Sequence, residues 1–138
     1  NDLTQYNAEI VLEGIVQSAK DCLAAGVPVG LGTDSSCPFV THYDMWRELY
    51  YFAKQAGVTP AFALHTATLG NARIARIADQ TGSIEVGKSA DIIVLEANPL
   101  EDLKALRNVA LVMARGTLVA HPCVKRIAAV DKQLDTLL

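Results

Sequence analysis

The first third of the chain carries a hydrophobic pattern that predicts one helix followed by one buried strand. From 4 to 25, apolar residues recur at the spacing of an amphipathic helix, with Thr4 as candidate N-cap and Gly26 as the C-terminal stop. The run from 27 to 33 is apolar and ends at Asp34, which indicates a buried strand that opens into a loop. Helix, turn and strand in this order predict an αβ unit of a parallel sheet.

Helices are also predicted between residues 41 and 80. Asp44, or Thr41 three residues earlier, is a candidate cap for a helix that ends at Gly57. The threonine-proline pair at 59–60 is typical of an N-cap and first helical position, so another helix follows to about residue 70, with further turns over 71–78. The apolar positions of the first of these helices are Met45, Trp46, Leu49, Tyr50, Phe52 and Ala53.

The pattern then changes to short runs typical of strands. These runs cover 84–86, 91–95, 109–113 and 118–120, and they are separated by turn sequences, so we expect a small antiparallel or mixed sheet. A final amphipathic helix is predicted over 124–138. The chain thus divides into three parts, 1–80, 81–123 and 124–138.

Composition favours a soluble globular protein. The chain has 138 residues, 51% of them hydrophobic, and a formal net charge of -3. Such a weak negative charge gives no electrostatic indication of binding to nucleic acid or anionic lipid, so we expect neither nucleic acid nor a membrane as a partner. The N-terminus lacks signal-peptide character, and we expect a cytosolic protein. Three cysteines without CxxC spacing predict buried free thiols, and a start at Asn1 suggests a piece of a longer protein.

The sequence GSIEVGKS at 82–89 matches the P-loop pattern, which binds nucleotide phosphates. A P-loop needs a strand before it and a helix after it, because the helix N-terminus helps to bind the anion. Here the alternation of Ile84, Glu85 and Val86 is strand-like, and Ser89 leads into another strand rather than a helix. We therefore interpret this segment as a tight turn between two strands.

Asp34 is the main candidate for chemistry, since α/β proteins place catalytic groups at the carboxyl ends of strands. From the local pattern, a cap for the following segment is an equal alternative. His42 lies in the same loop and is either a surface histidine or a ligand, whereas His65 and His121 fit structural or turn positions. No HxH, HxxE or HExxH pattern occurs, so local motifs predict no complete zinc site.

Four segments in succession resemble metal-dependent amidohydrolases, in particular imidazolonepropionases and Xaa-Pro or Xaa-Arg dipeptidases. They are GLGTD at 30–34, ATLGNA at 67–72, GSIEVGKSADIIVL at 82–95 and NPL at 98–100. The resemblance implies an α/β fold, namely the last part of a (β/α)8 barrel followed by the C-terminal strands of its β-sandwich. It also explains the apparent P-loop as a turn of the family.

The resemblance further implies metal-assisted hydrolysis of amide, cyclic amide or peptide C–N bonds. Asp34 matches the aspartate that follows the eighth barrel strand, a metal ligand and general base. His42 resembles a loop histidine that faces the substrate, and Ser35 beside Asp34 is the second candidate for substrate binding. The family's other ligands have no counterpart here, so we expect one or two Zn²⁺ ions in the parent enzyme and none in the isolated chain.

The sequence leaves two functions open. The first is the C-terminal portion of a hydrolase for a small amide or dipeptide, inactive by itself. The second is a non-catalytic α/β association module derived from the same fold. In either case, the helix over 4–25 and the helix around Trp46, Leu49 and Phe52 would expose apolar faces without a barrel. We therefore expect self-association, or association with the missing part of the barrel.

Overall fold

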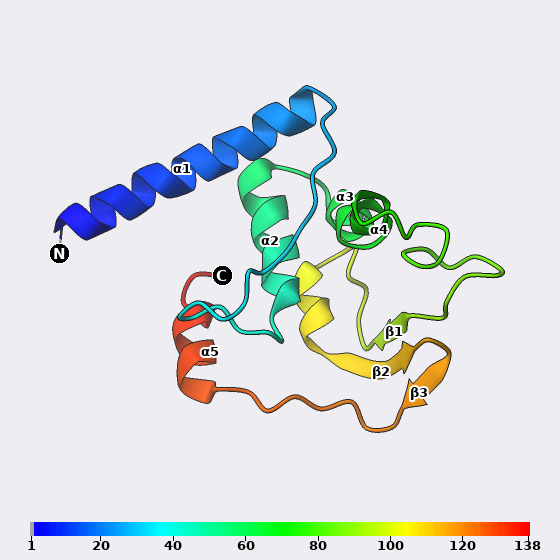
Figure 1. Cartoon of the computed structure of the whole chain (residues 1–138). Coiled ribbons are helices and arrows are strands. Elements are labelled where there is room, and N and C mark those ends of the chain that lie inside the picture. Colours follow the sequence, from blue (N-terminus) through cyan, green and yellow to red (C-terminus); the bar gives the residue numbers. More distant parts are fainter. Residues whose placement is uncertain (1) are drawn as a thin grey trace.

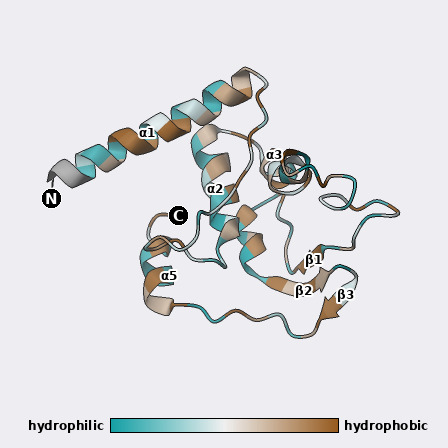
Figure 2. Ribbon diagram, in the orientation of Figure 1, coloured by the Kyte–Doolittle hydropathy of each residue, from teal (hydrophilic) through white to brown (hydrophobic). Residues whose placement is uncertain are grey.

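The computed structural model describes the backbone of residues 2–138 and the side chains of residues 5–138. It begins with a long helix, α1 (Asp2–Ala24), which extends away from the rest of the chain (Figure 1). The helix starts before Thr4, so this residue lies in its first turn and is not the cap. Gly26 follows its end with a φ of 70° and confirms the predicted stop. Figure 2 shows that apolar residues occur along α1. Several of their side chains are exposed, among them Ile15 at 62%.

The predicted strand over 27–33 is an extended segment that forms no strand ladder with any described residue. Its backbone is instead paired with one side chain. The Leu31 N–H donates to Asn71 Oδ1 at 2.9 Å, and Asn71 Nδ2 donates to the Leu31 carbonyl oxygen at 2.8 Å. A parallel strand needs neighbouring strands for its hydrogen bonds. Residues 2–138 supply none here, so the segment forms no ladder within this chain, and its place in a parallel sheet stays a prediction.

The next helices begin and end close to the predicted residues. Helix α2 (Met45–Ala56) ends at Gly57, whose left-handed φ of 75° allows its N–H to bond to the Ala53 carbonyl. Thr59 caps α3 (Pro60–His65) by accepting the Phe62 N–H at 3.2 Å, which confirms the predicted cap. A π-helical turn, η1 (Thr66–Gly70), continues into α4 (Asn71–Ile74). The helical turns expected up to residue 78 stop at Ile74, because the chain turns there.

The sheet is antiparallel, with the order β1 (Ile92–Leu95), β2 (Val109–Ala114) and β3 (Thr117–Val119). Arg115 and Gly116 join β2 to β3 with φ values of 49° and 77°, the signs that a tight hairpin turn requires. A short 3₁₀ helix, η2 (Leu103–Arg107), precedes β2 and was not predicted. The predicted strand at 84–86 is wrong, because Ile84 is 84% exposed and pairs with no described strand.

A small core forms where α2 and α3 meet η2. Its buried residues are Leu49, Phe52, Ala63 and Leu103. The expectation that α2 exposes its apolar face is therefore wrong, since η2 and α3 cover that face within this chain. The last helix, α5 (Ala128–Asp135), is shorter than the predicted 124–138, because the preceding residues run extended from β3 (Figure 1).

The three cysteines are free, as predicted, but they are not buried. Cys37 and Cys123 are exposed and Cys22 is half-buried, because the small core does not reach these segments. None of the helices within residues 2–138 combines the length and apolar character that a membrane crossing requires.

Candidate functional site

The candidate site is the loop 34–43, which follows the extended segment and leads into α2. Asp34, Ser36 and Phe39 in this loop have positive φ values of 48°, 96° and 66°. Residues other than glycine rarely adopt this conformation, because the Cβ atom crowds the backbone. Such strained positions persist where surrounding contacts hold the chain, and they cluster at functional sites.

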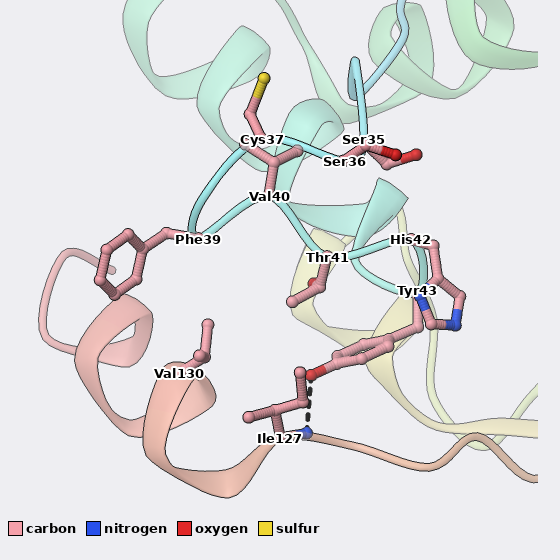
Figure 3. A pocket seen from close by; sticks show the side chains of 10 residues that line it. All are labelled: Ser35, Ser36, Cys37, Phe39, Val40, Thr41, His42, Tyr43, Ile127 and Val130. Atoms are coloured by element: carbon pink, nitrogen blue, oxygen red, sulfur yellow. Dashed lines mark hydrogen bonds between the residues drawn. The ribbon is translucent and has the colours of Figure 1, made fainter.

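The loop forms one wall of a hollow of about 260 Å³, and the C-terminal segment forms the other (Figure 3). The lining residues are Ser35, Ser36, Cys37, Phe39, Val40, Thr41, His42, Tyr43, Ile127 and Val130. Residues up to 95 positions apart in the sequence thus line the same pocket.

Two of the predicted site residues, Ser35 and His42, line this hollow. Both are exposed, and the His42 ring packs edge-on against Tyr43 with 5.2 Å between the ring centroids. Asp34 directly precedes the hollow and is also exposed. Its carboxylate accepts no hydrogen bond from any described residue, and no helix begins beside it, so it does not serve as a cap in this structure.

Asp44 anchors the end of the loop through a buried carboxylate, with only 4% of the residue exposed. It accepts hydrogen bonds from Thr41 Oγ1 and Trp46 Nε1 at 2.8 Å, and it pairs with Arg47 at 3.2 Å and Arg126 at 2.9 Å. Burial by itself raises the pKa of the Asp44 carboxyl, but the hydrogen bonds from Thr41, Trp46 and Arg47 outweigh it and hold this pKa below its usual value.

The same network attaches α5 to the loop and to α2. Arg126 bridges Asp44 to Asp131, and Arg47 reaches Asp135 at 2.7 Å. We call these five residues, Asp44, Arg47, Arg126, Asp131 and Asp135, the clasp. The hydrogen bond from Arg47 is the main reason that the pKa of Asp135 lies below its ordinary value, and Arg107 contributes in the same direction.

Tyr43 joins the loop to the C-terminal segment through hydrogen bonds of its uncharged hydroxyl group. Its hydroxyl accepts the Ile127 N–H at 2.9 Å and lies 3.3 Å from an Asp131 carboxylate oxygen, to which it donates. Sequence reasoning missed both this link and the clasp. The one available signal was the spacing of Asp131 and Asp135, which places two carboxylates on the same face of the last helix.

Metal binding needs more ligands than the described residues bring together. Among the side chains that the structure describes, those of residues 5–138, no group of three or more His, Cys, Asp and Glu is placed to hold an ion. Asp34 offers one carboxylate, whereas a catalytic zinc ion usually has three protein ligands. The donor set of this chain alone therefore does not fit a metal centre.

The P-loop-like segment does not form a phosphate cradle. Lys88 Nζ contacts Ser83 Oγ at 2.6 Å and Glu85 Oε1 at 3.0 Å, so its ammonium group is already paired locally. The segment leads into β1 and not into a helix, so it lacks the helix N-terminus that binds an anion in P-loop proteins.

Comparison with known proteins gives the family of the chain. The model of the amidohydrolase family matches residues 4–119. The chain belongs to the amidohydrolase family. Its structure superposes on that of a Bifidobacterium longum protein assigned as a prolidase with a TM-score of 0.93 and 47% identity, over 99% of this chain and 33% of the other. A Xaa-Pro dipeptidase structure with methionine in its active site gives a TM-score of 0.70 and 35% identity, over 76% of this chain and 25% of the other.

Curated amidohydrolase relatives agree with this assignment. Ochratoxinase from Aspergillus niger is 35% identical over 67% of this chain, and imidazolonepropionase from Thermoplasma acidophilum is 28% identical over 73%. The chain spans only 18% and 25% of these two relatives. The resemblance to imidazolonepropionases and Xaa-Pro dipeptidases is confirmed. So is the predicted fold class, because the helices and small antiparallel sheet match part of an amidohydrolase fold.

Proposed function

We propose that this chain is the C-terminal portion of a metal-dependent hydrolase that cleaves the C–N bond of a small amide, cyclic amide or dipeptide. The observation that carries the proposal is the superposition of 99% of the chain on one third of a protein assigned as a prolidase. The proposal assigns residues 1–80 to the barrel, 81–123 to the β-sandwich and 124–138 to a closing helix.

Asp34 is the proposed metal ligand and general base. Its carboxylate is exposed and has no partner among the described residues, so it is free to contact groups from the rest of the enzyme. A bound divalent ion such as Zn²⁺ would polarise the scissile carbonyl and make water more acidic. The Asp34 carboxylate would accept a proton from the attacking water and pass it to the departing nitrogen.

Ser35 and His42 are the proposed substrate-binding residues. Both line the hollow that begins directly after Asp34, and each carries a side-chain hydrogen-bonding group. Polar groups of this kind orient an amide substrate relative to the reacting carbonyl.

The rest of the enzyme is the proposed partner of a long apolar groove between α1, the extended segment and α2. The groove encloses about 640 Å³ and is lined mainly by apolar residues, among them Leu12, Ile15 and Leu31. The Tyr51 hydroxyl is buried there without a hydrogen-bond partner among the described residues, and burial raises the pKa of Glu48. An unpaired buried hydroxyl costs about 1–3 kcal/mol, which a further polar group would offset.

The decisive experiment uses the full-length enzyme that contains this chain. We expect Asp34→Asn to lower kcat/KM for dipeptides or cyclic amides by about 10²- to 10⁴-fold, since general base catalysis contributes that much. Asp79→Asn, an exposed aspartate outside the loop, is the matched control and should stay near wild type. Activity of Asp34→Asn within a few-fold of wild type would contradict the assignment. If the wild-type enzyme hydrolyses no amide, the association module is favoured instead.

A further inference from the structure

The hollow beside Ser35 and His42 has an apolar part that the proposed chemistry does not use. Phe39 and Val40 from the loop contribute to it, together with Ile127 and Val130 from the C-terminal segment. In Figure 3, Val130 points from α5 toward the loop, and Ser35 and His42 lie at the opposite side. Phe39 and Ile127 are 56% and 55% exposed, so a ligand in the hollow would cover apolar surface that now faces water.

The wall formed by Ile127 and Val130 is held in place before any ligand arrives. The Ile127 N–H donates to the Tyr43 hydroxyl at 2.9 Å, which joins this wall to the loop. Arg126, the neighbouring residue, pairs with Asp44 and Asp131. A preformed pocket binds more tightly than one that must first become ordered, because less conformational entropy is lost on binding.

Size and charge restrict what this part of the hollow accepts. Phe39, Val40, Ile127 and Val130, which line this part, carry no ionisable group, so a charged group there would have no counter-charge beside it. The volume of about 260 Å³ lies just below the range of about 300–1,000 Å³ that is usual for whole small-molecule ligands. The hollow therefore fits one part of a substrate, and that part is uncharged and apolar.

We propose that Phe39, Ile127 and Val130 form a specificity subsite for the apolar side chain of the amide substrate. This inference rests on the proposed hydrolase function. Substrate preference thus depends on the C-terminal segment, and Arg126 and Tyr43 act as positioning residues for this wall.

The kinetic test changes the size of the subsite in both directions in the full-length enzyme. Val130→Phe should fill it and lower kcat/KM for leucine-containing dipeptides by about 10-fold or more, a usual penalty in a hydrophobic pocket. The matching glycine substrates should change little. Val130→Ala should enlarge the subsite and shift the substrate preference toward larger apolar side chains. This effect is opposite to that of Val130→Phe, and misfolding would not produce it. Val124→Phe, on the same segment but outside the hollow, is the control.

A binding test on the 138-residue chain does not require activity. We would label the methyl groups of isoleucine and valine and titrate with N-acetyl-leucine amide, using N-acetyl-glycine amide as the reference probe. The leucine probe should shift the resonances of Ile127 and Val130, and Val130→Phe should abolish the shifts while Val124→Phe preserves them.

The two tests separate the subsite from the hydrolase function. Absent or scattered shifts, or equal kinetic losses for leucine and glycine substrates, would overturn the subsite. Localised shifts in a chain whose full-length form hydrolyses no amide would show that the hollow binds an apolar side chain, but they would reject the hydrolase function and with it the role of the hollow in substrate specificity.

Discussion

Gly82 is a single position where the backbone leaves no room for a side chain. Its φ is 92°, and a Cβ atom built there would lie 2.6 Å from the Ala72 Cβ and 3.1 Å from the Leu69 Cα. Leu69 lies in η1 and Ala72 in α4, which are consecutive helical turns. A side chain at residue 82 would therefore require these two turns to shift together. The segment after α4 thus packs closely only because residue 82 is glycine.

We therefore expect Gly82→Ala to reduce the free energy of unfolding by about 2–4 kcal/mol, the sum of backbone strain and overpacking. Gly87→Ala is the matched control, because Gly87 has a φ of 93° but nothing within 4 Å of its Cβ position. Gly87→Ala should reduce the free energy of unfolding by the backbone strain alone, about 1 kcal/mol. Denaturant unfolding of the two variants measures the difference, and equal losses would show that the close approach is unimportant.

Among the elements, α5 depends most on contacts with the others. It has 8 residues, and helices of this length are unstable in isolation because nucleation is costly. The clasp and Tyr43 supply its attachment to α2 and the loop. We infer that loss of the clasp releases α5 before the core around Leu49 unfolds.

The clasp makes this attachment dependent on pH. The pKa values of Asp44 and Asp135 are both lowered in the folded chain. Their stabilising contribution is thus fully present above the ordinary aspartate pKa of about 3.9, and it is lost as pH falls through the lower folded values. Fluorescence of Trp46, the only tryptophan, reports the change, because its Nε1 donates to Asp44.

We expect Asp44→Ala to weaken this acid-sensitive step, because only the contribution of Asp135 then remains. The variant should also destabilise the chain by about 3–5 kcal/mol, since it leaves Arg47 buried with one carboxylate fewer. Asp79→Ala, at an exposed position, should leave the fluorescence titration unchanged. A wild-type-like acid transition in Asp44→Ala would show that the clasp does not control α5.

For the molecule as a whole, the main feature is the apolar surface that remains exposed. Ile15 is 62% exposed on α1, and the groove beneath that helix is open. Burying 1,000 Å² of apolar surface is worth about 25 kcal/mol before the entropy of association is subtracted. Because burying this surface is favourable, we propose that the chain associates with the rest of the enzyme or with itself.

Sedimentation of the 138-residue chain at micromolar concentration should therefore show oligomers. Ile15→Lys should shift the distribution toward monomer, because a charge on the groove side of α1 opposes burial. Gln17→Lys places the same charge on the opposite side of the helix and should have little effect. A cooperatively melting wild-type monomer would contradict the proposal.

Local features of the fold were predictable because they depend on neighbours in the sequence. Gly57 ends α2 through its own backbone conformation, and Thr59 with Pro60 begins α3 through a hydrogen bond three residues away. Arg115 and Gly116 likewise form the hairpin turn that their sequence indicated. The family was also predictable, since its motifs are contiguous segments. The site assignments of Asp34, Ser35 and His42, the three-part division and the cytosolic location remain predictions.

Contacts between distant residues were not predictable from the pattern. The run over 27–33 is as apolar as a strand, but its ladder requires neighbouring strands, and one side chain, Asn71, pairs with it instead. Ile127 and Val130 reach the loop because Arg126 meets Asp44, a contact 82 positions apart. Hydrophobic periodicity specifies which face of an element is apolar, but not which element covers it. That choice depends on the shape and charge of surfaces that exist only after the chain has folded.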